Sequence, residues 1–188
     1  MFQLRANIST LSAYALTMAL LTFFTFGSLS THLFDTDDHE YLEHASQVVK
    51  GDASLFPSGG RLPVRPVIDL LAWGSYLLWG DNPAPYHILL VVVLLHLLAS
   101  LLLAYTLRQL GIGLELSLLA ALLFLMNVAH FRVVHWVTCR SYVLALTFGL
   151  GMLICYSRFL ASRRVGWMAG AVGLQAVAIS VQPAMVSA

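Results

Sequence analysis

Long apolar segments, separated by shorter polar ones, run along most of this chain. Nothing from Ala6 to Phe34 carries a formal charge, and no Asp, Glu, Lys or Arg occurs from Asn82 to Leu107. A helix needs about 20 apolar residues to cross a bilayer, so the pattern predicts membrane-spanning helices. The predicted spans are Thr10–Ser30, Pro85–Leu107, Leu116–Phe131, Ser141–Ser157 and Val165–Ala184.

A further apolar segment, Val67–Trp79, is shorter and carries Asp69 together with Trp73, Tyr76 and Trp79. As a helix it would reach only about 20 Å, against roughly 30 Å for the hydrocarbon core of a bilayer. Amphipathic aromatic side chains prefer the membrane–water boundary. We therefore expect a helix that lies near the membrane plane on the outer side, with a spanning helix as the alternative.

The polar loop between the first span and Arg65 contains one predicted short helix. Asp37 and Glu40 have the spacing of a capping box, with Asp in place of Ser or Thr. This spacing predicts a helix over His39–Lys50 that stops at Gly51, because glycine readily adopts the left-handed conformation that ends a helix.

Composition agrees with the membrane interpretation. The chain has 188 residues, of which 59% are hydrophobic and 10% charged, and its mean hydropathy is +0.81. Soluble domains carry about 25% charged residues. We predict an all-α polytopic membrane protein with one membrane domain over 1–188: a first span in 1–30, an extracytoplasmic loop with short helices in 31–82, and four further spans in 83–188. The net charge of +1 implies no nucleic-acid partner.

Basic residues predict the orientation of this domain. Short cytoplasmic loops are rich in Lys and Arg, so Arg108, Arg158 and the pair Arg163 and Arg164 are expected inside. The N-terminus is then cytoplasmic and the first loop extracytoplasmic, in a bacterial inner membrane or a membrane of the endoplasmic-reticulum type. Arg132 and Arg140 fall outside against the rule, and we interpret this as a functional signal.

The densest polar cluster lies just after the first span. Asp35, Asp37, Asp38 and His39 are close together there. A carboxylate among them, Asp37 or Asp38, could act as a general base that takes a proton from an acceptor hydroxyl. A helix cap with solvated acids is the structural alternative. Oxygen ligands from Asp35, Asp37 and Asp38 could also hold a divalent cation, although no calcium-loop spacing is present and no metal site is assigned.

Basic and imidazole side chains on the same face are candidates for substrate binding. Guanidinium groups bind phosphate in a bidentate manner, whereas contact with lipid headgroups is the structural alternative. The candidates are Arg65, Arg132, Arg140, His39 and His135. His96 lies in the middle of a span, and we expect it to face the interior and find a packing partner.

An ordered set of motifs resembles the GT-C glycosyltransferases. The set begins with the acidic pair Asp37-Asp38 after the first span and Arg65-Pro66 before the interfacial helix. It continues with Trp79-Gly80-Asp81-Asn82-Pro83, which leads to Tyr86-His87, and then with His96. It ends with His135-Trp136-Val137 and Arg140-Ser141-Tyr142. The resemblance covers about residues 8–185. It is nearest to O-mannosyltransferase-like members that often carry tetratricopeptide repeats.

This resemblance implies sugar transfer from a polyprenyl-phosphate donor at the outer face, with an acidic residue of the first loop as base. GT-C enzymes have more spans than the five predicted before Ala188, so we expect either a fragment or a short relative. Two classes of function therefore remain. The chain is a glycosyltransferase module, inactive alone if truncated, or a non-catalytic subunit that holds other subunits in a larger membrane complex.

Overall fold

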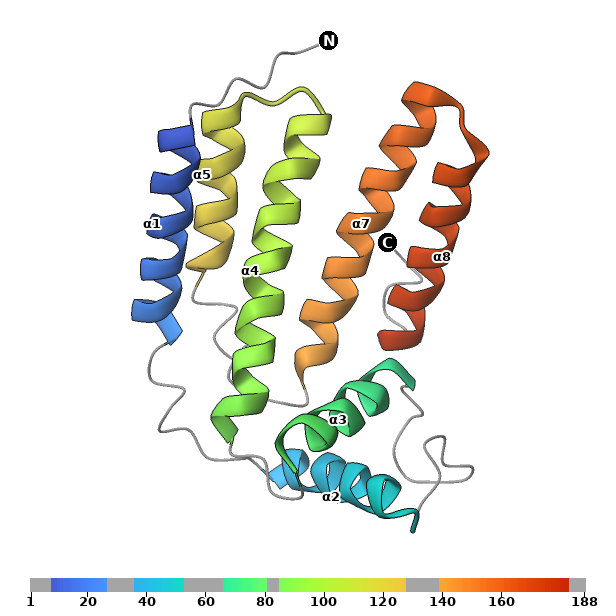
Figure 1. Cartoon of the computed structure of the whole chain (residues 1–188). Helices are drawn as coiled ribbons and strands as arrows, with labels where there is room; N and C mark the ends of the chain where they lie inside the picture. Colours follow the sequence, from blue (N-terminus) through green and yellow to red (C-terminus); the bar gives the residue numbers. More distant parts are fainter. Residues whose placement is uncertain (1–7, 27–35, 53–65, 81–84, 128–138, 183–188) are drawn as a thin grey trace.

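The computed structural model describes residues 8–26, 36–52, 66–80, 85–127 and 139–182, and every regular element in these ranges is an α-helix. The all-helical class is therefore confirmed for this part of the chain. Helices α1, α4, α5, α7 and α8 run side by side, whereas α2 and α3 lie across one end of them, at the bottom of Figure 1. The bounds are α1 Ile8–Phe26, α2 Thr36–Lys50, α3 Pro66–Trp79, α4 Pro85–Gln109, α5 Leu114–Leu125, α7 Arg140–Ser162 and α8 Val165–Val181.

Two of the described helical segments are long and apolar enough to cross a membrane, His87–Gln109 in α4 and Arg140–Ser162 in α7. The others are shorter. For α5 the predicted span ran to Phe131, and this was wrong, because the helix ends at Leu125 after 12 residues. At 1.5 Å per residue that is about 18 Å, which is less than the thickness of the hydrocarbon core.

Helix α4 turns its polar side chains inward. His96 is 1% exposed, and its Nε2 lies 3.4 Å from the carbonyl oxygen of Leu125 on α5. One turn further along, the Ser100 hydroxyl donates to the Ala121 carbonyl oxygen at 2.7 Å. These contacts hold α5 against α4, and the expectation that His96 packs in the interior is confirmed. The opposite face of α4 exposes leucines at helical spacing: Leu90, Leu94, Leu98 and Leu101.

Glycines let α7 and α8 approach each other closely. A Cβ at Gly151 would lie 3.3 Å from Leu174, and one at Gly170 would lie 3.5 Å from the Cys155 sulfur. Gly166, in contrast, has no such neighbour within 4 Å. Of the two glycines one turn apart on α8, Gly166 and Gly170, only Gly170 thus takes part in this contact. Cys155 is a free, half-buried thiol.

Helix α3 joins two buried clusters at the lower end of the molecule. Its Tyr76 belongs to the first cluster, which gathers residues of α1, α2 and α4 around it. Its Leu71 packs against the second cluster, formed by α7 and α8. The buried members are Phe26, Leu42, Tyr76, Ile88, Leu89 and Val93 in the first, and Leu144, Ala145 and Val181 in the second.

Candidate functional site

The acidic segment after the first span forms the start of α2. This helix begins at Thr36, so Asp37 and Asp38 stand in its first turn, where the partial positive charge of the helix N-terminus favours carboxylates. The predicted start at His39 with Asp37 as cap was wrong by three residues. His39 is exposed in the same turn, and the side chains of Asp37 and Asp38 lie outside the described part of the structure.

The C-terminus of α2 lies where the sequence predicted it. The helix ends at Lys50, and Gly51 follows with φ +82°. The Gly51 amide donates to the Val48 carbonyl oxygen, and the Asp52 amide donates to that of Gln47. This pair of hydrogen bonds is a Schellman motif, in which a left-handed glycine closes the helix.

Aromatic contacts fix α2 and α3 against the longer helices. Leu42 of α2 and Tyr76 of α3 are both buried in the first cluster. Trp79, the last residue of α3, stacks on His87 in the first turn of α4, with centroids 5.3 Å apart. Tyr76 was expected to anchor α3 at the membrane surface, and this was wrong, because it is 7% exposed and packs between helices. Trp73 is exposed and remains available for that role.

Arg140 is the first residue of α7 and is only 3% exposed. The next residue, Ser141, is fully buried, and its hydroxyl makes no hydrogen bond within the described ranges. Among the described residues, no side chain caps this end of α7. A buried guanidinium, a buried hydroxyl and the amides of a helix N-terminus are together well suited to hold a phosphate.

Gln182 is a third buried polar residue at the same end. It is 9% exposed, and its Oε1 finds no hydrogen-bond partner among the described residues. It directly follows Val181, which packs against Leu144 and Ala145 of α7. Arg140 stands one turn before Leu144, and Ser141 one turn before Ala145. Gln182 therefore comes to the same end of the helices as the start of α7.

The sequence reasoning missed Ser141 and Gln182. Neither residue type is unusual near the end of a span, and only burial without a described partner marks them. The rule-breaking position of Arg140 was the signal that pointed toward this region.

Several predicted site residues lie outside the described ranges: Arg65, Arg132, His135 and Asp35. The proposed cation site at Asp35, Asp37 and Asp38 therefore stays a prediction. Among the residues that the structure describes, no group of three or more His, Cys, Asp or Glu side chains is placed to hold a metal ion.

The structure thus brings two features to one end of the molecule: an acidic helix start and a buried basic helix start. Helix α3 lies between them, since it contacts α2 through one cluster and α7 and α8 through the other (Figure 1). Comparisons of the chain with family models, with curated proteins and with solved structures find no match.

Proposed function

We propose that this chain is a membrane-embedded module of the GT-C type, which binds a polyprenyl-phosphate sugar at the end covered by α3. The observation that carries the proposal is the buried pair Arg140 and Ser141 at the N-terminus of α7. A guanidinium group binds phosphate in a bidentate manner, and a helix N-terminus favours an anion beside it.

The distribution of exposed side chains supports placement in a membrane. On α5, Ser117 and Ala121 are buried, whereas leucines face outward; on α1, two adjacent phenylalanines are more than two-thirds exposed. In water this arrangement would be unfavourable, since large apolar patches are rare on soluble monomers. In lipid it costs nothing, because the hydrocarbon chains are as apolar as leucine. The outward residues are Leu116, Leu119 and Leu123 on α5, and Phe23 and Phe24 on α1.

The proposed base is Asp37 or Asp38 in the first turn of α2. Asp38 precedes the buried Leu42 by one helical turn, so the two positions lie on the same face of α2. This register favours Asp38, since that face of α2 is the one that packs against α3 and α4. The base takes the proton of an acceptor hydroxyl while the oxygen of that hydroxyl bonds to the anomeric carbon of the sugar. The bond from this carbon to the phosphate breaks, and the departing phosphate is held by Arg140 and Ser141.

The test is sugar transfer from a polyprenyl-phosphate sugar by the chain reconstituted in lipid. Asp38→Asn is expected to lower the rate about 10²–10⁴-fold, the range for loss of a general base, with Asp37→Asn as the competing variant. Asp52→Asn, an exposed acid beyond the end of α2, is the matched control. No transfer by the wild type, under conditions in which an intact GT-C enzyme works, would remove the catalytic proposal.

The proposed orientation has its own test. With the N-terminus cytoplasmic, α2 is extracytoplasmic and Arg108, Arg158, Arg163 and Arg164 are cytoplasmic. A cysteine introduced by Asp52→Cys should react with an impermeant maleimide in intact cells, while one introduced by Ser162→Cys should react only after permeabilisation. The reverse labelling pattern would invert the orientation.

A non-catalytic subunit of a larger membrane complex is the second candidate. Gly166 and Gly173 on α8 have no neighbour within 4 Å of their Cβ positions. Open glycines on a lipid-facing helix allow another helix to approach closely. Co-purification of defined additional subunits, together with transfer activity that is unaffected by Asp38→Asn, would favour this candidate.

A further inference from the structure

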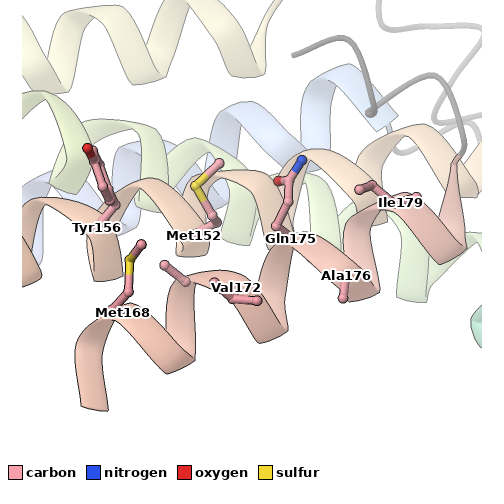
Figure 2. Close-up of a pocket in the computed structure, with 8 residues that line it drawn as sticks. Met152, Tyr156, Met168, Val172, Gln175, Ala176 and Ile179 are labelled. Atoms are coloured by element: carbon pink, nitrogen blue, oxygen red, sulfur yellow. The ribbon is translucent and has the colours of Figure 1, made fainter. Parts of the chain in front are cut away.

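An apolar groove runs between α7 and α8 on the side of the molecule away from α1. It has a volume of about 390 Å³, in the range of small-ligand sites. Figure 2 shows Tyr156 and Met168 at one end of it and Ala176 and Ile179 at the other. Gln175 rises from α8 in between, with its amide oxygen buried. The groove therefore presents almost only hydrocarbon and thioether atoms.

The length of this groove corresponds to one leaflet of a bilayer. From Met168 to Ile179 the helix advances by 11 residues, or about 16 Å. Half of a hydrocarbon core of roughly 30 Å is about 15 Å. Because α8 runs alongside the long helices, the groove also has the direction of an acyl chain in that leaflet (Figure 1).

Positive charge gathers where the groove begins. The turn between α7 and α8 carries Arg163 and Arg164, both exposed, and Arg158 lies one turn earlier. The Arg158 guanidinium donates to the Tyr105 hydroxyl and lies 5.8 Å from the centre of the Trp167 ring. The N-terminus of α8 adds its partial positive charge, and no Asp or Glu occurs anywhere from residue 116 to residue 188.

We propose that this face binds one anionic phospholipid. Its phosphate sits at Arg163, Arg164 and the start of α8, and one acyl chain fills the groove beside Met168 and Val172. Basic pockets between membrane helices on the cytoplasmic side recognise anionic headgroups in this way. Trp167, which is 38% exposed, stands at the level of the headgroup, where tryptophan is favoured. The inference rests on the proposed membrane placement, but not on sugar transfer.

The experiment uses Trp167 as the reporter. The full chain, with Trp73, Trp79 and Trp136 each replaced by Phe, is reconstituted in phosphatidylcholine vesicles that contain brominated phosphatidylglycerol or brominated phosphatidylcholine. Quenching of Trp167 is expected to show a preference of about five- to thirtyfold for phosphatidylglycerol, from one or two arginines near the phosphate at about 1 kcal/mol each. Arg163→Gln with Arg164→Gln should abolish this preference. Lys50→Gln, which removes a positive charge at the opposite end, should leave it unchanged.

A second variant tests the groove itself. Ala176→Phe fills the groove and is expected to reduce quenching by brominated phosphatidylglycerol, whereas Leu94→Phe on the outer face of α4 is the matched control. Equal quenching by both lipids would overturn the lipid site while leaving membrane placement intact. Quenching by neither lipid would overturn both.

Discussion

Arg140 and Arg158 stand near opposite ends of α7, and they differ in burial and in their position relative to the helix dipole. Arg140 opens the helix and is 3% exposed, whereas Arg158 lies in the last two turns and is exposed. The helix dipole disfavours a cation at the first position and favours one near the end. Arg158 also rests beside the rings of Tyr105 and Trp167, at 6.0 and 5.8 Å.

This comparison separates a structural arginine from a functional candidate. Arg158 lies where electrostatics and aromatic contacts both favour it, so stability alone explains its position. Arg140 is buried, and the helix dipole at the first position of α7 disfavours a cation there. Residues kept at a cost to stability are frequent at binding sites. The two arginines therefore predict opposite responses to mutation.

Substitution of His96, in the middle of α4, should have the largest effect on the free energy of unfolding. His96→Ala removes a buried ring that packs against Phe26 and Phe124 and leaves a cavity between α1, α4 and α5. We expect a loss of about 2–5 kcal/mol in the free energy of unfolding, the range for large-to-small core substitutions. Unfolding in detergent micelles would measure it. A loss below 0.5 kcal/mol would show that the α4–α5 contact is not a core.

Under the proposed function, Arg140→Ala should weaken substrate binding. Loss of a charge-assisted hydrogen bond costs about 1.5–3 kcal/mol, so kcat/KM for the polyprenyl-phosphate sugar should fall about 10–100-fold, mainly through KM. Ser141→Ala should shift KM in the same direction. Arg158→Ala is the control and should change kcat/KM by less than about twofold, since surface changes away from the site have small effects. Equal losses of kcat/KM from Arg140→Ala and Arg158→Ala would show that the two arginines do not differ in function.

The contact between α7 and α8 can be tested with a matched pair of glycines. Gly170→Leu inserts a side chain against Cys155 and should lower the free energy of unfolding by about 1–3 kcal/mol, as overpacking does. Gly166→Leu points into open space and should change it by less than about 0.5 kcal/mol. If Gly166→Leu instead disrupts assembly with other chains, the subunit function gains support.

Arg158→Ala should lower stability less than His96→Ala does. Cation–π contacts at exposed sites are worth about 0.5–1 kcal/mol, and removal of the guanidinium loses two of them together with the hydrogen bond to Tyr105. Arg158→Lys should recover part of this loss. Thermal unfolding with Arg140→Ala measured in parallel would show whether the stability and binding effects separate between the two ends.

The sequence by itself determined the helical class and several of the helix bounds. Pro85 and Val165 begin α4 and α8 as predicted, and Gly51 ends α2, because proline, glycine and charge act locally on the backbone. The inward position of His96 also followed from the sequence, since an imidazole in an apolar segment needs a polar partner.

The tertiary structure alone decided which residues meet. It buried Tyr76 between helices, shortened α5, and used Gly170 but left Gly166 open. It also brought Gln182 to the end of the molecule where Arg140 and Ser141 are buried. Apolar segments of this kind are alike on every face, so periodicity does not say which face meets a neighbour and which meets lipid. Burial, which depends on all helices at once, decides that.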